Sequence, residues 1–339
     1  MDTNERLELV TRNIQEIIPK EDLIKLLQKK KKPVIYWGTA PTGKPHIGYL
    51  LPALKIADLL KAGFKVKILL ADIHAALDNV EWTVLEKRYK YYEKVIPLLI
   101  QCIGVDTKNL EFVKGSDYQL KKDFIFDVLK LSTIVSVHDA HKAASDVVKM
   151  GENPKLSGLL YPLMQALDEE YLGVDAQLGG TDQRKIMVLA RENLPKIGYA
   201  SRVEIMNPII PGLIGKKMSS SDPKSKIDLL DSDEEIKSKI KGAYCEAGKV
   251  EDNGVLAFVQ YVLFTIKSDQ KAPLIIERPE KFGGNQVYYT YSDLESDFIN
   301  QKLHPQDLKN TLAKELILLL KPMQKYKTEL ESLAKEAYS

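Results

Sequence analysis

Cysteine is nearly absent from this chain of 339 residues, which contains only Cys102 and Cys245. Two isolated thiols form neither a disulfide framework nor a set of metal ligands, so a reducing compartment is favoured. Long apolar runs are also missing, so no membrane-spanning helix and no membrane partner are expected. Residues 1–5 have neither the basic nor the apolar character of a targeting segment. The sequence therefore predicts a cytoplasmic protein.

Composition and length set further bounds on the class of protein. Hydrophobic residues make up 44% of the chain and charged residues 28%, which are ordinary values for a globular protein. The net charge of +2 does not by itself indicate a nucleic-acid partner. The sequence shows no repeats or low-complexity tracts. Because the chain is longer than a typical single domain, we expect two domains.

Strands and helices alternate along much of the sequence, which predicts an α/β fold with a parallel sheet covered by helices on both faces. Residues 1–33 are predicted to be a helical segment, a largely helical block near 123–172 interrupts the alternation, and 231–339 is predicted to be mostly helical. The expected strands are 34–37, 66–71, 110–113 and 176–178. The expected helices of the sheet unit are 46–61, 82–103 and 124–136.

Two loops far apart in the sequence have the composition of phosphate-binding elements. Residues 40–49, Ala-Pro-Thr-Gly-Lys-Pro-His-Ile-Gly-Tyr, follow an apolar strand and open an apolar helix. Backbone N–H groups at such a helix N-terminus can bind phosphate. Residues 217–221, Lys-Met-Ser-Ser-Ser, form a hydroxyl-rich loop with a lysine. Together the loops predict a nucleotide whose phosphates are held between them.

Four further strings accompany the two loops: Ala-Asp-Ile-His at 71–74, and the segments 161–168, 179–185 and 304–309. In this order the six strings resemble the class I aminoacyl-tRNA synthetases, whose HIGH and KMSKS signatures correspond to the two loops. The intervening residues are similar to those of the tyrosyl-tRNA synthetases of the archaeal and eukaryotic cytosolic type. The resemblance extends from about residue 23 to the end of the chain.

The resemblance implies a particular division of the chain. A Rossmann-like catalytic domain would occupy residues 34–211, after the helical segment 1–33. Residues 212–230 would form the KMSKS-type loop and a linker, and 231–339 an all-helical anticodon-binding domain. In the resembled family, the helical insertion near 123–172 builds the interface of a homodimer.

The reaction implied by the resemblance is the activation of L-tyrosine with ATP to tyrosyl-adenylate and pyrophosphate, followed by transfer to tRNA(Tyr) in protein biosynthesis. The amino acid's own carboxylate attacks the α-phosphorus, so the enzyme needs positioning and electrostatic stabilisation rather than a nucleophile. The absence of any Ser/His/Asp or Cys/His pattern agrees with this chemistry. ATP is expected as a co-substrate with Mg²⁺, and no protein-bound metal is predicted.

Two residues are expected to act in catalysis. His46 would donate an imidazole N–H to a phosphate oxygen, and Lys217 would hold the β- and γ-phosphates as pyrophosphate departs. The structural alternatives are a proline–glycine turn with a capping histidine, and a solvated lysine loop. The expected ATP-binding residues are Ala40, Gly43, His46, Gly48, Gly180, Asp182, Lys217, Met218 and Ser219.

Both signatures depart from the family pattern at one position. Tyr49 replaces the second histidine of HIGH, which weakens any functional assignment there. Ser220 replaces the second lysine of KMSKS, so half of the expected positive charge is missing. Lys216, Lys226 or a bound cation could supply that charge.

Three polar residues at i, i+4 and i+7, Tyr161, Gln165 and Asp168, share one helix face. A polar stripe usually faces solvent, but this stripe has no lysine and suits a buried polar pocket. By resemblance, Tyr161 and Gln165, together with Gln183, hold the ammonium group of tyrosine. Asp168 and Tyr36 would contact its phenolic hydroxyl.

Two further residues follow strands. Asp182, after the glycine pair at 179–180, is expected to accept a hydrogen bond from a ribose hydroxyl. A glycine turn with a capping Asp is the alternative. His74 could line the amino-acid pocket, but a lone buried histidine is more often structural, so it is not assigned.

Four residues are implied by the resemblance to bind tRNA. Arg184 would contact the first base pair of the acceptor stem. Phe282 and Asp307 would read the anticodon, because an exposed aromatic ring can stack on a base and a carboxylate can accept from a guanine edge. His304 precedes Asp307 in the same motif. The alternative for this motif is the first turn of a helix with a capping Asp.

The sequence argues against three rival functions. A tryptophanyl enzyme would share the fold, but Asp168 and Tyr36 suit a hydroxyl rather than an indole. A catalytically silent RNA-binding paralogue is expected to lose residues such as His46 or Lys217, and both are present. A small-molecule nucleotidyltransferase would leave the helical C-terminal domain without a role. We interpret the sequence as that of a homodimeric tyrosine–tRNA ligase.

Overall fold

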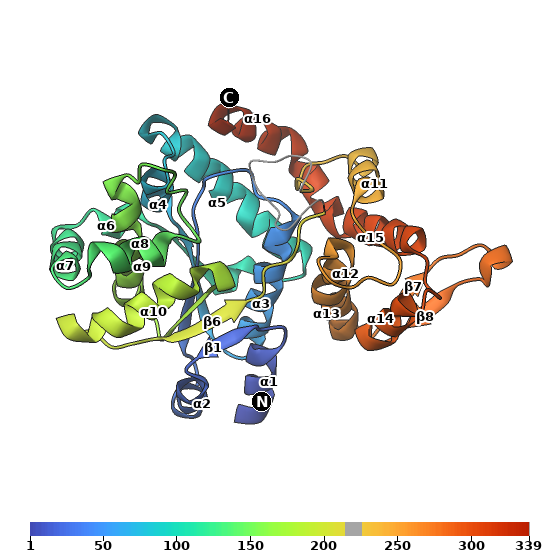
Figure 1. The fold of residues 1–339 in the computed structure, drawn as a ribbon, viewed down its shortest axis with the longest axis horizontal. Coiled ribbons are helices and arrows are strands. Elements are labelled where there is room, and N and C mark those ends of the chain that lie inside the picture. The colour runs from blue at the N-terminus through green and yellow to red at the C-terminus, as the bar shows by residue number, and fades with distance from the viewer. Residues whose placement is uncertain (214–225, 339) are drawn as a thin grey trace.

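The computed structural model describes residues 1–213 and 226–338 and is built around a six-stranded sheet (Figure 1). The strand order is β1-β6-β5-β2-β3-β4, and every neighbouring pair is parallel except the edge pair β1–β6. The predicted α/β fold with a parallel sheet is therefore confirmed. The strands are β1 (Glu16–Ile18), β2 (Val34–Thr39), β3 (Lys65–Leu70), β4 (Leu110–Lys114), β5 (Ala176–Gly180) and β6 (Val203–Asn207).

The strand order reverses between β2 and β5. From β2 the chain continues to β3 and β4 on one side, and it later adds β5 and β6 on the other side. In open α/β sheets, ligands bind at the carboxyl ends of the strands at such a switch point. The loops after Thr39 and Gly180 therefore meet at the edge where a nucleotide site is expected.

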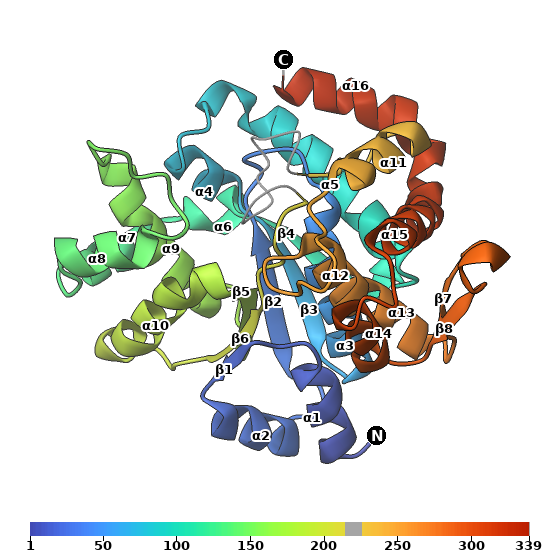
Figure 2. The ribbon, with the colours of Figure 1, turned by 45° about the vertical axis from the view of Figure 1, so that its right-hand side comes forward.

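Two groups of helices cover the two faces of the sheet (Figure 2). Ile35 and Ile68 pack toward α3 and α5 on one face, whereas Tyr36 and Leu69 pack toward α7, α9 and α10 on the other. Successive side chains of a strand point to opposite faces, which explains this division. The helices of this part are α1 (Thr3–Thr11), α2 (Lys20–Lys29), α3 (Leu50–Lys61), α4 (Asp72–Leu77), α5 (Leu85–Cys102), α6 (Ser116–Gln119), α7 (Lys122–Ser132), α8 (Val137–Ala144), α9 (Leu156–Tyr171) and α10 (Arg184–Asn193).

The structure differs from the sequence-based expectation at several places in this part, and β6 was not among the expected strands. The N-terminal segment is not wholly helical, because β1 lies between α1 and α2 and pairs with β6. The helix expected at 124–136 ends at Ser132, and a separate helix α8 follows. The break is explained by Ser136, whose Oγ accepts a hydrogen bond from the Asp139 N–H at 3.1 Å and caps α8.

The C-terminal part is mostly helical, as expected, and its first helix begins with a strong N-cap. Ser232 and Glu235 form a reciprocal capping box at the start of α11. A small antiparallel hairpin, β7–β8, was not anticipated from the sequence. Among the described helices, none is both long and apolar enough to cross a membrane. The elements are α11 (Asp233–Gly242), α12 (Gly254–Phe258), α13 (Phe264–Asp269), β7 (Leu274–Ile276), β8 (Gln286–Tyr288), α14 (Tyr291–Ile299), α15 (Pro305–Leu320) and α16 (Lys327–Tyr338).

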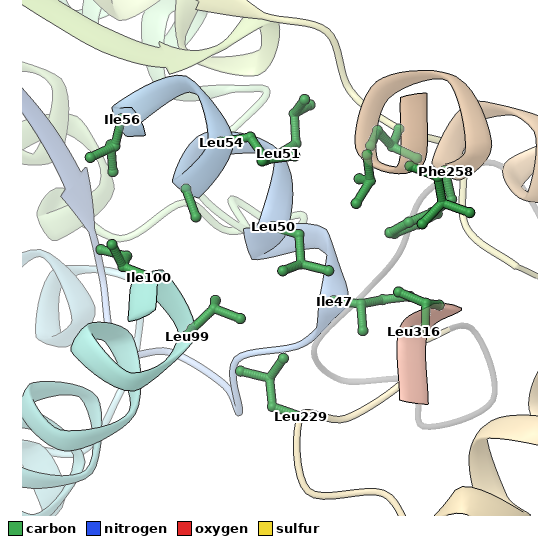
Figure 3. Packing of buried hydrophobic residues seen from close by; sticks show 14 of the residues in the cluster. Ile47, Leu50, Leu51, Leu54, Ile56, Leu99, Ile100, Leu229, Phe258 and Leu316 are labelled. Atoms are coloured by element: carbon green, nitrogen blue, oxygen red, sulfur yellow. The ribbon is translucent and has the colours of Figure 1, made fainter. Parts of the chain in front are cut away.

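The apolar core continues from the sheet into the C-terminal helices. In Figure 3, Ile47 just before α3 and Leu50 at its start lie between Leu99 of α5 and the C-terminal residues Phe258 and Leu316. All five side chains are at most 1% exposed. Because burial of such side chains stabilises each by about 1.5–3 kcal/mol, the helix that follows the loop 40–46 is anchored on both sides.

Candidate active site

A cavity of about 1580 Å³ opens at the carboxyl edge of the sheet, at the switch point between β2 and β5. Its walls come from the loops after these two strands, from α9, from residues 226–239 and from α16. Sites for one small ligand usually have about 300–1,000 Å³, so this cavity is large enough for two substrates. One end is lined by buried phenols and a carboxylate, and the other by the loop 40–46 and several lysines.

The closed end contains Tyr36 and Asp168, each 1% exposed. The buried hydroxyl Oη of Tyr36 has no hydrogen-bond partner among the described residues. Burial raises the pKa of this phenol well above its usual value, as do the nearby carboxylates, so it remains a neutral donor. An orphaned buried hydroxyl costs free energy unless a ligand completes its hydrogen bond. Tyr36 is therefore arranged to meet a polar group on a ligand.

Asp168 is held in place by two side chains that the sequence analysis missed. Its Oδ1 accepts hydrogen bonds from Tyr118 Oη and from Gln119 Nε2, both at 2.7 Å. Burial raises the Asp168 pKa to about 7, although these two hydrogen bonds oppose the rise. With Oδ1 occupied, the second oxygen, Oδ2, remains to accept from a ligand hydroxyl. Tyr118 and Gln119 lie just beyond β4, so their position at the carboxyl edge was the available signal.

His74, which the sequence left unassigned, also belongs to this network. Its Nδ1 lies 3.2 Å from Gln119 Nε2, and its Nε2 lies 3.7 Å from Asp168 Oδ2. Burial lowers the His74 pKa to about 4, so the ring is neutral near pH 7 and forms no true ion pair with Asp168. The ring packs edge-on against Tyr161 at 4.6 Å between centroids. His74 thus supports the pocket wall.

The middle of the cavity is lined by the amides and phenol that the sequence grouped together. Gln165 Nε2 donates to Gln183 Oε1 at 3.0 Å, which joins α9 to the turn after β5. Tyr161, Gln165 and Asp168 are all buried on α9 and all line the cavity. The polar stripe on α9 therefore faces a pocket rather than solvent. The structure brings together all five residues predicted to bind tyrosine.

His46 lies at the other end of the cavity and caps the helix that follows. Its Nδ1 accepts the Gly48 N–H at 3.1 Å, so in the neutral ring the proton resides on Nε2. Burial lowers the His46 pKa to about 4, and the positive charge of Lys226 lowers it further in the same direction. The imidazole is thus a neutral Nε2–H donor at physiological pH. The capping role and the predicted donor role are compatible.

The other predicted residues of this loop divide into two groups. Ala40 and Gly43 line the cavity. Gly48 is not part of the cavity wall, and its N–H donates to His46. Tyr49, which stands at the second histidine position, lies 3.2 Å from Thr39 Oγ1 and from Tyr92 Oη through its hydroxyl. Its hydroxyl therefore braces the loop.

The turn after β5 contributes Gly180 and Asp182 to the cavity wall. A Cβ atom at Gly180 would lie 2.6 Å from Asp182 Oδ1, so glycine is needed for the carboxylate to approach the backbone.

Lys217, Met218 and Ser219 of the KMSKS-like loop lie outside the described residues. Among the residues that are described, no group of three His, Cys, Asp or Glu side chains could hold a metal ion.

Two of the predicted tRNA-binding residues, Arg184 and Phe282, lie at the protein surface. Arg184 forms a bidentate ion pair with Glu16, with 2.7 Å between Nε and Oε2 and 3.0 Å between Nη2 and Oε1. The Arg184 side chain is half-exposed. Phe282 is 58% exposed, in the segment between β7 and β8, and Lys281 lies over its ring at 4.9 Å. An exposed ring of this kind is available for stacking on a base.

The motif at the start of α15 is arranged differently from the capping alternative. His304, rather than Asp307, caps the helix, because its Nδ1 accepts the Gln306 N–H at 3.1 Å. Asp307 instead forms an ion pair with Arg278, with 3.1 Å between Oδ2 and Nε. The proposal of a capping Asp is therefore wrong, and the carboxylate already has a cationic partner.

Comparison with known proteins adds an independent line of argument. Residues 28–321 match the family model of "tRNA synthetases class I (W and Y)". The chain is 52% identical over 338 residues to the cytoplasmic tyrosine–tRNA ligase of Gallus gallus, covering 98% of this chain and 63% of that relative. It is 49% identical over 332 residues to the cytoplasmic tyrosine–tRNA ligase of Saccharomyces cerevisiae, covering 96% of this chain and 84% of the relative.

Solved structures agree with these sequence relatives. The crystal structure of tyrosyl-tRNA synthetase complexed with L-tyrosine from Archaeoglobus fulgidus has a TM-score of 0.89 to this structure and 41% identity. The match covers 96% of this chain and 99% of that chain. The chain belongs to the class I tRNA synthetases of the tryptophan and tyrosine family and, within it, to the tyrosyl-tRNA synthetases of the archaeal and eukaryotic type.

Proposed function

We propose that this protein activates L-tyrosine with ATP to tyrosyl-adenylate and then transfers the tyrosyl group to tRNA(Tyr), in the cytoplasm. The observation that carries the proposal is the closed end of the cavity, where the unpartnered Tyr36 hydroxyl and the free oxygen of Asp168 face the same space. This pair suits a ligand hydroxyl that both donates and accepts. The relative from Archaeoglobus fulgidus was solved with L-tyrosine.

The cavity would fix the orientation of the bound tyrosine. With its phenol between Tyr36 and Asp168, the substrate would place its ammonium group near Gln165 and Gln183. Its carboxylate then points toward the loop that contains His46. Such fixed placement of two reactants supplies much of the rate enhancement without a covalent enzyme intermediate.

The activation step needs only groups that stabilise charge. A carboxylate oxygen of tyrosine forms a bond to the α-phosphorus of ATP, and the bond from that phosphorus to the bridging oxygen of pyrophosphate breaks. His46 Nε2–H donates to a phosphate oxygen, and Mg²⁺ arrives with ATP. Lys217 is proposed to hold the leaving pyrophosphate. In the second step, a ribose hydroxyl of tRNA attacks the tyrosyl carbonyl carbon and AMP departs.

Exchange of pyrophosphate into ATP tests this proposal. The full chain should catalyse exchange with L-tyrosine and form tyrosyl-tRNA with a tRNA(Tyr) transcript. Phenylalanine and tryptophan should support exchange far less well, since neither fills the polar end of the cavity with a hydroxyl. Exchange that depends on tryptophan, or on no amino acid, would contradict the proposed substrate.

The proposed homodimer is supported by an exposed apolar patch on α7 and α8. On α7, Phe126 and Leu129 are 57% and 58% exposed, and Val137 at the start of α8 is 72% exposed. Large exposed apolar side chains on successive helices are typical of an interface. The patch lies within the helical block 123–172 that the sequence analysis assigned to the dimer interface. We propose that a second copy of this chain covers it.

Leu129→Asp should convert a dimer into monomers. A carboxylate buried in an apolar interface without a partner weakens association strongly, and we expect a loss of at least about 100-fold in dimer affinity. Analytical ultracentrifugation over a concentration series measures the change. Leu318→Asp is the matched control, because Leu318 is 54% exposed on α15, outside the patch. Equal dimer affinity for both variants would place the interface elsewhere.

The proposed anticodon contact is tested by Asp307→Ala. This variant should leave pyrophosphate exchange unchanged, since Asp307 lies on α15 outside the cavity, but it should raise KM for tRNA(Tyr). Loss of a base contact costs about 1–3 kcal/mol and relaxes the preference for that base. Charging of transcripts with native and altered anticodons measures both effects. Glu277→Ala, which removes a carboxylate that is ion-paired with Lys314, is the control. If base preference survives in Asp307→Ala, the carboxylate serves only to hold Arg278.

A further inference from the structure

Lys226 is a buried lysine in the cavity wall and one of three groups that could supply the charge missing at Ser220. The residue is 4% exposed, and its Nζ lies 3.3 Å from the backbone oxygen of Lys44. Among the described residues, no carboxylate lies within ion-pair distance of this Nζ. Burial lowers the pKa of Lys226, because an ammonium group is costly to desolvate, although the negative charge of Asp228 opposes the shift.

The backbone of the loop that contains His46 fixes the position of Lys226. Ile47 N–H donates to Ile227 O at 3.1 Å, and His46 forms an antiparallel bridge with Asp228. Lys226 is therefore attached to the same rigid scaffold as the imidazole. Its positive charge also lowers the His46 pKa, which shows that the two groups share one electrostatic environment.

Other lysines around the cavity are less suited to act on the same phosphates. Lys239 is neutralised by Asp231, whose Oδ2 lies 2.5 Å from its Nζ. Lys149 is exposed, and its backbone N–H bonds to Asp78 beside the amino-acid pocket. Among the described residues, the lysines that line the cavity are Lys44, Lys149, Lys226, Lys239, Lys327 and Lys335, and of these Lys226 is the buried one.

We propose that Lys226 supplies the second positive charge on the β- and γ-phosphates of ATP, in place of the KMSKS lysine that is Ser220 here. The inference rests on the proposed activation reaction. A phosphate oxygen would provide a direct anionic contact with Nζ, which no described carboxylate makes within ion-pair distance. As the bond between the α-phosphorus and the bridging oxygen breaks, negative charge moves onto pyrophosphate, and a desolvated cation at this position stabilises it.

The test compares three variants of the full chain: Lys226→Met, which keeps much of the shape but removes the charge; Lys226→Arg, which keeps the charge; and Lys237→Met. Lys237 is the matched control, since it is an exposed lysine on α11 that does not line the cavity. One readout is the single-turnover rate of tyrosyl-adenylate formation. The other is the binding of inorganic pyrophosphate with Mg²⁺, measured by isothermal titration calorimetry, together with the thermal unfolding temperature.

Lys226→Met should slow adenylate formation by about 10- to 100-fold and weaken pyrophosphate binding by at least about tenfold. Lys226→Arg should recover most of both, and Lys237→Met should match the wild type. Unchanged rate and unchanged pyrophosphate affinity in Lys226→Met would overturn the inference. So would equal losses in the Met and Arg variants together with a lowered unfolding temperature, because Lys226 would then only support the loop.

The experiment also distinguishes a wrong substrate assignment from a wrong role for Lys226. Pyrophosphate binding does not depend on which amino acid is activated. A wild-type protein that fails to activate tyrosine would therefore contradict the proposed substrate, while the pyrophosphate affinities of the variants would still decide the role of Lys226.

Discussion

Asp168→Ala should lower kcat/KM for tyrosine activation by on the order of 10²-fold while leaving the slow activation of phenylalanine nearly unchanged. Hydrogen bonds to a charged partner contribute about 1.5–3 kcal/mol, and only tyrosine has the hydroxyl that can use this one. Tyrosyl-tRNA synthetases are known to discriminate against phenylalanine by about 10⁵. The ratio should fall by the factor that tyrosine loses.

Parallel pyrophosphate-exchange assays with tyrosine and phenylalanine measure this ratio. Tyr118→Phe is an informative companion, because it removes one hydrogen bond to Asp168 Oδ1 while leaving Oδ2 in place. It should affect the ratio less than Asp168→Ala does. If the ratio stays at its wild-type value in a folded Asp168→Ala protein, the phenol is recognised elsewhere.

The same carboxylate predicts a pH dependence. Burial raises the Asp168 pKa to about 7, so lowering the pH through about 7 protonates the group that should accept from the substrate hydroxyl. Because kcat/KM reports ionisations of the free enzyme, kcat/KM for tyrosine should decline as the pH falls below about 7. The neighbouring Glu169 is also buried, with a pKa raised to about 8. The decline near pH 7 should persist in Glu169→Gln if Asp168 causes it.

The residues of one helix face were accessible to sequence reasoning, because they form a regular pattern. Tyr161, Gln165 and Asp168 recur at helical spacing and contain no lysine, and the structure buries all three on α9. The short apolar runs likewise predicted β2 to β5 to within a few residues. Local periodicity encodes these features, so no tertiary information was needed.

The features that the sequence did not predict depend on contacts between residues far apart in the chain. Gln119 reaches Asp168 across 49 residues of sequence, and no local pattern marks such a pair. The three-residue strand β1 exists because β6 pairs with it, since its own length is too short to signal a strand. The helix cap was expected at Asp307 rather than at His304, because Asp is a common helix cap and histidine is an uncommon one.

His46→Ala should lower kcat for tyrosine activation by on the order of 10²-fold or more, with little change in KM for tyrosine. The residue lies at the phosphate end of the cavity, away from the pocket formed by Tyr36 and Asp168. Its Nε2–H donor is therefore expected to act on charge that develops in the transition state, and loss of such a donor appears in kcat. The substitution also removes a helix cap, which costs about 0.5–2 kcal/mol of stability.

Two further substitutions separate the cap from the donor. Asn at position 46 can accept the Gly48 N–H as Nδ1 does, but it is too short to replace Nε2–H, so His46→Asn should unfold near the wild-type temperature and still lose most of kcat. His46→Gln, whose amide reaches farther, should retain more activity. Burial and Lys226 lower the His46 pKa to about 4, so His46 does not titrate near pH 6.5. The pH profile of kcat near 6.5 should therefore be the same in the wild type and in these variants. A loss confined to KM for tyrosine would instead assign His46 to ground-state binding, and full activity in His46→Asn would leave it only the cap.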